Sequence, residues 1–256
     1  MKIITVEECE STNSMLKKMI SDNDLLPSFT FIRAVNQTKG RGQRGNTWEA
    51  VPGENLTFSF VIRPLQLNPS RNFIISEAAA VAVARFLKKF FITEDYSIEI
   101  KWPNDILVDN RKIAGILIEN SLGPDGHILN SIIGIGININ QATFTDKAPN
   151  ATSLTALTGK RYDLQQLMNE ISQIITVTIQ QIIDAENQTN EDIPIKIEDY
   201  YHSCLWRKHG IHKWLQDSDQ TVFNAYIVSV EPSGHLILKT SDGDIRRYLF
   251  KEVFPI

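Results

Sequence analysis

The hydrophobic residues of the chain follow two different periods, and each period predicts its own kind of element. In residues 56–62 every second position is apolar, which is the period of a strand with one buried face. Residues 29–35 and 96–102 are predicted to be strands as well. Residues 106–120 predict a hairpin that turns at Asp109–Asn110. These segments provide the strands of a sheet.

Three other segments have their apolar residues at helical spacing. Residues 11–23 begin with the capping residues Ser11, Thr12 and Asn13, so a short helix is expected there. Residues 76–91 are rich in alanine, whose small side chains allow a helix to lie close to a sheet. Residues 163–185 place a continuous apolar face behind a cap at Asp163. The chain is therefore predicted to mix helices and strands.

Residues 131–140 predict a strand with two contrasting faces. One face carries four isoleucines, and the other carries Gly134, Gly136, Asn138 and Asn140. Glycine weakens a strand, so two of them on one face indicate that a ligand or another backbone approaches closely. A helix packed on the strand explains the glycines equally well.

The pattern of apolar and polar residues changes near residue 209. From there, short apolar runs such as residues 221–230 and 235–240 are separated by turn residues. About 48 residues suit a small β module that docks on a larger unit. We therefore expect two domains, residues 1–208 and 209–256.

Composition limits the functions that the chain can have. A net charge of −4 over 256 residues gives no general electrostatic support for a nucleic-acid partner. No signal peptide and no membrane span are found in the sequence, so no membrane partner is expected. Cys9 and Cys204 have no disulfide or metal spacing. Reduced thiols and a cytoplasmic location are expected.

The stretch at residues 38–50 matches the G-x-G-x-x-G pattern of dinucleotide-binding folds. Its glycines are Gly40, Gly42 and Gly45. That pattern needs a helix after the third glycine, whereas the segment that follows here has the period of a strand. No acidic residue occurs between Ala34 and Trp48, while Arg41 and Arg44 do. The stretch is therefore predicted to be a cationic loop for an anion.

A second group of polar and charged residues surrounds a proline turn at residues 101–112. Its members are Lys101, Trp102, Asn104, Asp105, Arg111 and Lys112. Taken alone, the segment could be a solvated edge with turn-forming residues. Together with the cationic loop and the glycine strand it offers what a nucleotide needs, namely accessible backbone, cations and a tryptophan. A P-loop, the kinase motifs, a zinc-type histidine spacing and a nucleophile elbow do not occur in the sequence.

Five motifs together resemble those of biotin protein ligases in order and spacing. They are ESTN (10–13), Gln37 with GRG and RGNTW (40–48), KWPNDILVDNRKIAGILIE (101–119), GIGIN (134–138) and ATSL (151–154). The resemblance implies an α+β catalytic domain with a mixed sheet and flanking helices, related to class II aminoacyl-tRNA synthetases and lipoate ligases, followed by an SH3-like β-barrel. It also implies that biotin and ATP with Mg²⁺ form biotinyl-5′-AMP and pyrophosphate. A specific lysine of a biotin carboxyl carrier protein or domain then takes the biotin and releases AMP.

The resemblance also implies roles for individual residues. Lys112 and Arg41 are the expected catalytic residues, with Lys112 on the α-phosphate. Biotin is expected at Ser11, Thr12, Asn13, Gln37, Arg41, Gly42, Gln43, Lys112 and Gly115. ATP and the adenylate are expected at Gly40, Arg41, Arg44, Trp48, Asn104, Lys112 and Asn138. Trp48 would lie against adenine, Asn138 would hydrogen-bond it, and Asp105 would orient Lys112 or help to hold the metal.

The sequence departs from the family pattern in two places. Gln43 and Asn46 stand where many relatives have arginine, which leaves open how tightly the adenylate is retained. The ligase motifs begin at Glu10, so we expect a monofunctional ligase without the DNA-binding segment that some relatives carry before them. A lipoate or octanoate ligase on the same fold and a non-catalytic biotin or adenylate sensor are the alternatives. A homodimer is left open.

Overall fold

A mixed seven-stranded sheet forms the larger part of the protein in the computed structural model. The structure describes residues 1–22, 26–64, 67–91, 96–124, 126–146, 148–187 and 192–256. The strands of this sheet are β1 (Lys2–Cys9), β2 (Thr30–Gln37), β3 (Leu56–Ile62), β4 (Ile98–Lys101), β5 (Asp105–Val108), β6 (Arg111–Leu122) and β7 (Ile128–Ile137). Their order is β1-β2-β3-β7-β6-β5-β4, in which β1 and β2 are parallel and the other neighbours antiparallel. The predicted strands are confirmed, except that the one expected at residues 131–140 ends at Ile137, which leaves Asn138 and Asn140 beyond β7. The mixed sheet with flanking helices matches the expected α+β class.

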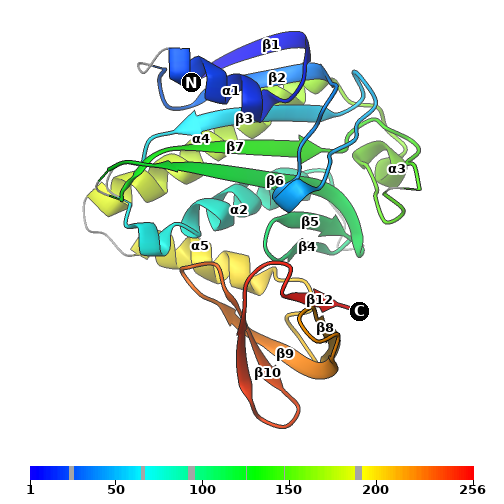
Figure 1. Cartoon of the computed structure of the whole chain (residues 1–256). Coiled ribbons are helices and arrows are strands. Elements are labelled where there is room, and N and C mark those ends of the chain that lie inside the picture. The colour runs from blue at the N-terminus through cyan, green and yellow to red at the C-terminus, as the bar shows by residue number, and fades with distance from the viewer. Residues whose placement is uncertain (23–25, 65–66, 92–95, 125, 147, 188–191) are drawn as a thin grey trace.

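Helices cover the two faces of this sheet unequally (Figure 1). The helices are α1 (Thr12–Asp22), α2 (Ile74–Lys88), α3 (Leu154–Thr158), α4 (Leu164–Asn187) and α5 (Asp192–Ser203), with short 3-10 turns at Gln43–Gly45 and Pro69–Arg71. The α2 helix lies against β4, β5 and β6 on the rear face of the sheet in this view, and α4 and α5 pack on α2. α1 lies on the opposite face, over β3 and β7. The layer of α2, α4 and α5 covers one face of the sheet, so a ligand can reach the sheet from the other face, on which α1 lies.

The alanine-rich helix is confirmed, with different ends from those predicted. α2 begins at Ile74 and not at Ser76, and it ends at Lys88. The amides of Lys89 and Phe90 donate to carbonyls three residues earlier, which closes the helix before Phe91. All three alanines of residues 78–80 are buried, so the small side chains do bring the helix close to the sheet.

The hairpin turn between β5 and β6 is also confirmed. Asp109 and Asn110 have φ angles of 48° and 62°. Positive φ at both central residues is the signature of the type I′ turn, which asparagine and aspartate tolerate better than other side chains. The turn places Lys112 at the beginning of β6, in the register position opposite Leu107.

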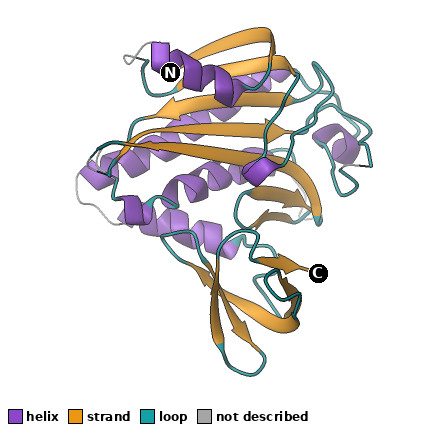
Figure 2. Ribbon diagram, viewed as in Figure 1, coloured by secondary structure: helices purple, strands orange, loops and turns teal. Residues whose placement is uncertain are grey.

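The C-terminal residues form a second, antiparallel sheet, seen below α5 in Figure 2. Its strands are β8 (His212–Gln216), β9 (Val222–Val230), β10 (Leu236–Thr240), β11 (Ile245–Tyr248) and β12 (Val253–Pro255), in the order β11-β10-β9-β8-β12. This arrangement fits the predicted small β module. Closure into an SH3-like barrel and the boundary at residue 209 stay predictions. No helix among the described residues is long and apolar enough to cross a membrane.

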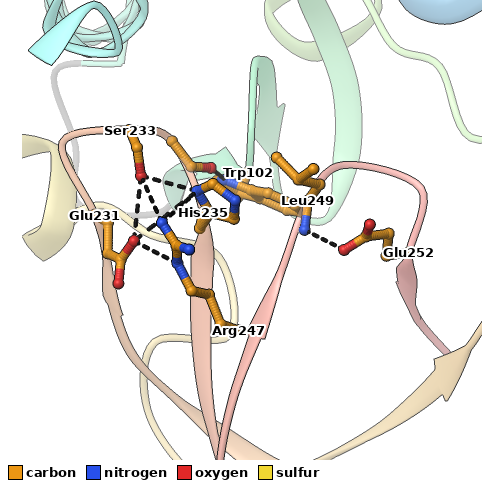
Figure 3. A network of polar contacts seen from close by, with 8 residues as sticks. Trp102, Glu231, Ser233, His235, Arg247, Leu249 and Glu252 are labelled. Atoms are coloured by element: carbon orange, nitrogen blue, oxygen red, sulfur yellow. Dashed lines mark hydrogen bonds and ion pairs between the residues drawn. The ribbon is translucent and has the colours of Figure 1, made fainter. Parts of the chain in front are cut away.

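The turn between β9 and β10 joins this module to the larger sheet (Figure 3). Trp102 Nε1 donates to the carbonyl of Gly234 at 3.0 Å. The guanidinium of Arg247, in strand β11, binds Glu231 of this turn at 2.7 Å and Ser233 at 3.3 Å, and Ser233 contacts His235 Nδ1 at 2.8 Å. The C-terminal module therefore holds the side chain of Trp102, which belongs to the proline turn predicted from the sequence.

Candidate functional site

One cavity on the α1 face brings together the residues for which a biotin role was expected. It lies between the N-terminal end of α1, the loop after β2 and strands β6 and β7. The expected residues that line it are Ser11, Thr12, Asn13, Gln37, Arg41, Gly42, Gln43, Lys112 and Gly115. Phe58, Ile116 and Ile135 also line the cavity, but their side chains are buried in the core on the other face of the sheet. Leu117, in the register position opposite Gly134, and Trp48 add apolar side chains. The cavity thus has a polar end and an apolar lining.

Buried polar side chains are joined in a network at the start of α1. The amide and hydroxyl of Thr12 donate to Gln37 Oε1 at 2.8 and 3.1 Å. The hydroxyl of Ser59 lies 2.5 Å from both Thr12 Oγ1 and Asn13 Oδ1. Asn13 Nδ2 donates to Glu119 Oε2 at 2.8 Å. Since Thr12, Asn13 and Ser59 are at most 3% exposed, these bonds fix the side chains before any ligand binds.

The two glycines of β7 lie against different parts of the site. A Cβ atom on Gly134 would overlap the carboxamide of Asn13 in α1. A Cβ atom on Gly136 would overlap the indole ring of Trp48 in the loop. At Gly134 the packed helix that the sequence left open is found, whereas at Gly136 a loop side chain approaches the strand. The bare face of the strand is confirmed as a surface of close approach.

The glycine-rich loop folds back on itself between β2 and β3. The amide of Gly42 donates to Asn46 O at 2.7 Å, and the amide of Trp48 donates to Gly40 O at 3.0 Å. A 3-10 turn ends at Gly45, whose φ of 86° favours glycine. Residues 46–55, all of which the structure describes, contain no α-helix before β3 begins, so the dinucleotide mechanism is excluded for this stretch.

The side chain of Arg41 extends from this loop toward the polar end of the cavity. Its guanidinium forms a two-point contact with Glu119, with Nη2 2.9 Å from Oε1 and Nη1 3.3 Å from Oε2. Glu119 therefore accepts hydrogen bonds from both Arg41 and Asn13. The side chain of Arg44, expected on the adenylate, lies outside the described part of the structure. Gly40 forms the neck of the loop, where a Cβ atom would overlap the Trp48 carbonyl.

Lys112 and Asp105 form an ion pair on the wall of the cavity. Lys112 Nζ lies 2.7 Å from Asp105 Oδ1 and 5.7 Å from the centre of the Trp48 ring. The backbone of Lys112 is fixed by bonds to Asn150 and Thr152. The ion pair brings Asp105 into contact with Lys112, and a role of Asp105 in orienting Lys112 stays a prediction. Among the residues that the structure describes, no group of three or more His, Cys, Asp or Glu side chains could hold a metal.

A second cavity shares this wall with the first. Trp48, Asp105 and Lys112 line both cavities, and Asn138 lines the second. Asn138 is buried, and its Nδ2 donates to Thr152 O at 3.0 Å. Asn104 lines the first cavity, and its side chain donates to the carbonyl of Ile116. The expected adenylate residues Trp48, Lys112 and Asn138 thus meet around the second cavity.

Two polar atoms beside these cavities are buried without a protein partner. They are Gln43 Oε1 and Trp48 Nε1, and neither has a hydrogen bond within the described part of the chain. Buried polar atoms are nearly always paired in proteins. An acceptor and a donor are therefore available to a ligand at the loop.

The structure also adds residues that the sequence did not single out. Ser59 belongs to the buried network, Glu119 binds Arg41, and Trp206 lines the second cavity. Phe250 of the C-terminal module lines the first cavity. Only Glu119 had a local signal, because it ends the motif that contains Lys112.

Comparison with known proteins agrees with this geometry. Residues 6–138 match the model of the biotin/lipoate A/B protein ligase family. The bifunctional ligase/repressor BirA of Bacillus subtilis is 29% identical over 230 residues, covering 86% of this chain and 65% of that protein. The biotin–[acetyl-CoA-carboxylase] ligase of Mycobacterium tuberculosis is 28% identical over 188 residues, covering 73% of this chain and 67% of that protein. The chain thus spans about two thirds of the length of these curated relatives.

Among solved structures, the fold resembles that of a biotin protein ligase from Aquifex aeolicus in complex with biotin and ATP. The two superpose with a TM-score of 0.76 at 24% identity, over 100% of this chain and 98% of that one. At this level of identity the similarity concerns the fold alone. It covers both the seven-stranded sheet and the C-terminal module.

Proposed function

Because the chain belongs to the biotin/lipoate A/B protein ligase family, we propose that it is a biotin protein ligase that uses ATP to attach biotin to a lysine of a biotin carboxyl carrier protein or domain. The observation that carries the proposal is the wall of Trp48, Asp105 and Lys112 between two cavities. Because these residues line both cavities, the cavities adjoin, and a carboxylate held in one can reach a phosphate held in the other.

The first cavity suits the ureido ring and aliphatic chain of biotin. A ureido group has two N–H donors and one carbonyl acceptor. Hydroxyl and carboxamide groups of Thr12, Asn13 and Gln37 offer matching partners at the polar end. Leu117 and the ring of Trp48 offer apolar surface for the rest of the molecule.

The second cavity suits the nucleotide. Trp48 supplies an aromatic face and an unpaired Nε1 donor, and Asn138 supplies a fixed carboxamide. Asp105 fits Mg²⁺, which is usually held by one or two carboxylates together with substrate phosphates. The bound ion would neutralise phosphate charge.

In the first step the biotin carboxylate attacks the α-phosphorus of ATP. A bond forms between a carboxylate oxygen and phosphorus, the bond to the β-phosphate oxygen breaks, and pyrophosphate leaves with the electron pair. Two anions must approach for this to happen. The Lys112 ammonium stands on the shared wall, oriented by Asp105, and stabilises the negative charge of the transition state.

In the second step the neutral ε-amine of the carrier lysine attacks the acyl carbon of biotinyl-5′-AMP. An amide bond forms, the bond to the phosphate oxygen breaks, and AMP leaves while the amine loses a proton. Lys112 is again beside the phosphate that takes up the charge.

Two alternatives fit the residues less well. A lipoyl dithiolane ring has no N–H or carbonyl group, so it would leave the polar groups at the start of α1 without ligand partners. A non-catalytic sensor has no need of a lysine and carboxylate at the junction of the two cavities.

The test is incubation of the protein with biotin, ATP, Mg²⁺ and a purified carrier domain. We expect a mass increase of one biotinyl group on the carrier lysine, and no increase when that lysine is changed to arginine. No mass gain with wild-type carrier would contradict the proposal. Pyrophosphate exchange that lipoate stimulates and biotin does not would favour the lipoate alternative.

A further inference from the structure

Lys101 stands between the second cavity and a third one. The third cavity lies between the larger sheet and the C-terminal module, where Trp102, Phe250 and Phe254 line it. Lys101 and Trp206 line both the second and the third cavity. Neither residue lines the first cavity, in which we place biotin. Lys101 therefore lines the nucleotide cavity and not the biotin cavity, although the third cavity shares Asn46, Asn104, Asp105 and Phe250 with the biotin cavity.

The Lys101 ammonium is half buried and forms no ion pair with the residues that the structure describes. It is the last residue of β4, in the register position opposite Asp105. Within the described ranges, no carboxylate oxygen lies within the 4.0 Å of an ion pair, and the carboxylate of Asp105 binds Lys112 instead. Burial lowers the pKa of Lys101, while Asp105 raises it and Lys112 lowers it further. A half-buried cation without a counterion beside a cavity favours an anionic ligand.

The indole ring of Trp206 fixes the position of this ammonium. Lys101 Nζ lies 5.1 Å from the centre of the ring. The amide of Trp206 donates to Ile100 O at 2.9 Å, and its Nε1 donates to Asn110 Oδ1 at 2.7 Å. The ring is thus held at both ends, by β4 and by the β5–β6 turn. Lys101 is pre-positioned and not merely a solvated surface lysine.

We propose that Lys101 is a catalytic residue that binds the β- and γ-phosphates of ATP and stabilises the departing pyrophosphate. This inference rests on the proposed function. In phosphoryl and nucleotidyl transfer the attacking and leaving oxygens lie roughly in line with phosphorus. Biotin attacks from the first cavity and Lys112 holds the α-phosphate on the shared wall. A leaving group that departs from the first cavity enters the second, which Lys101 lines and where its ammonium can bind it. The electron pair of the broken bond goes to pyrophosphate, and no proton is required.

Separate assays of the two half-reactions test the proposal. In Lys101→Gln we expect the KM values for ATP and for pyrophosphate in biotin-dependent exchange to rise about tenfold or more, since one charge-assisted contact is lost. Transfer from chemically prepared biotinyl-5′-AMP to the carrier needs no pyrophosphate and should stay within about twofold of wild type. Lys101→Arg keeps the charge and should retain most of the exchange activity. Lys213→Gln, an exposed lysine of β8, is the matched control.

Two results would overturn the assignment of Lys101. One is unchanged KM values for ATP and pyrophosphate in Lys101→Gln. The other is an equal loss in exchange and in transfer from biotinyl-5′-AMP, which would indicate a structural role. If the wild-type protein forms no adenylate from biotin and ATP, the proposed function itself fails. The two failures are therefore distinguishable.

Discussion

The ammonium of Lys112 lies 2.7 Å from the carboxylate of Asp105, on the wall that separates the two cavities. The pair is only partly buried, with 37% and 26% of the two side chains exposed. It therefore contributes little to stability by itself. The position of the pair gives a better reason for its presence than stability does, because the Lys112 ammonium at this junction faces both substrates.

Replacement of Lys112 by alanine should strongly slow adenylate formation and leave biotin binding largely unchanged. The ammonium stabilises charge that develops only in the transition state, so its loss should cost about 10²- to 10³-fold in kcat. Pyrophosphate release measures the first effect and calorimetric titration with biotin the second. Lys160→Ala, an exposed lysine outside both cavities, is the control. Unchanged turnover in Lys112→Ala would show that its role is wrongly assigned.

The two glycines of β7 should affect different substrates. Gly134→Ala pushes its methyl group into the carboxamide of Asn13 and should raise the KM for biotin. Gly136→Ala pushes its methyl group into the Trp48 ring and should raise the KM for ATP. Neither glycine has a positive φ, so the effects are steric and not due to backbone strain. We expect changes of about tenfold, because overpacking costs 1–3 kcal/mol.

Each of these variants is the control of the other. Titration of both substrates against both proteins separates the two effects. An equal rise of both KM values in both variants would contradict the assignment and would indicate a general disturbance of the sheet.

Glu119→Gln should weaken biotin binding severalfold. The carboxylate accepts from Asn13 at the polar end and forms a two-point contact with Arg41. Arg41 is 45% exposed, so solvent screens the pair and we expect a loss of only ~1 kcal/mol. Glu10→Gln removes a comparable but more exposed pair with Lys39 and should leave the biotin Kd unchanged. A biotin Kd that is also unchanged in Glu119→Gln would exclude the coupling between Glu119 and the biotin site.

Local sequence patterns predicted those parts of the site that local geometry determines. The alternation in residues 131–140 identified the bare face of β7, and Asp109–Asn110 identified the turn before Lys112. Ser59 and Trp206 escaped prediction because their contacts join distant segments. The bond of Ser59 spans 46 residues to Asn13, and that of Trp206 spans 96 residues to Asn110. Such pairs arise only from tertiary packing, which the period of a single strand does not contain.

A carboxyl group on the opposite side of the sheet should make the stability of the protein depend on pH. Glu77 of α2 is 3% exposed, and burial, with the nearby Glu198 carboxylate, raises its pKa to about 8 against the opposing effect of Arg71. Between pH ~4.5 and ~8 the unfolded chain releases this proton while the folded chain keeps it. The free energy of unfolding should therefore fall as the pH rises through this window, by at most about 4 to 5 kcal/mol, and level off above it.

Denaturant titrations at a series of pH values from 5 to 9 measure this slope. Glu77→Gln places a neutral group of similar shape at the site, so its free energy of unfolding should vary less with pH and exceed that of wild type at pH 9. In the control Glu170→Gln the slope of wild type should remain, because a hydrogen bond from Lys89 lowers the pKa of Glu170 and keeps it ionised in this range. Equal slopes in wild type and Glu77→Gln would mean that Glu77 is already ionised in the folded protein at neutral pH. Its charge would then have to be balanced by Arg71, which also pairs with Glu198 at 3.5 Å.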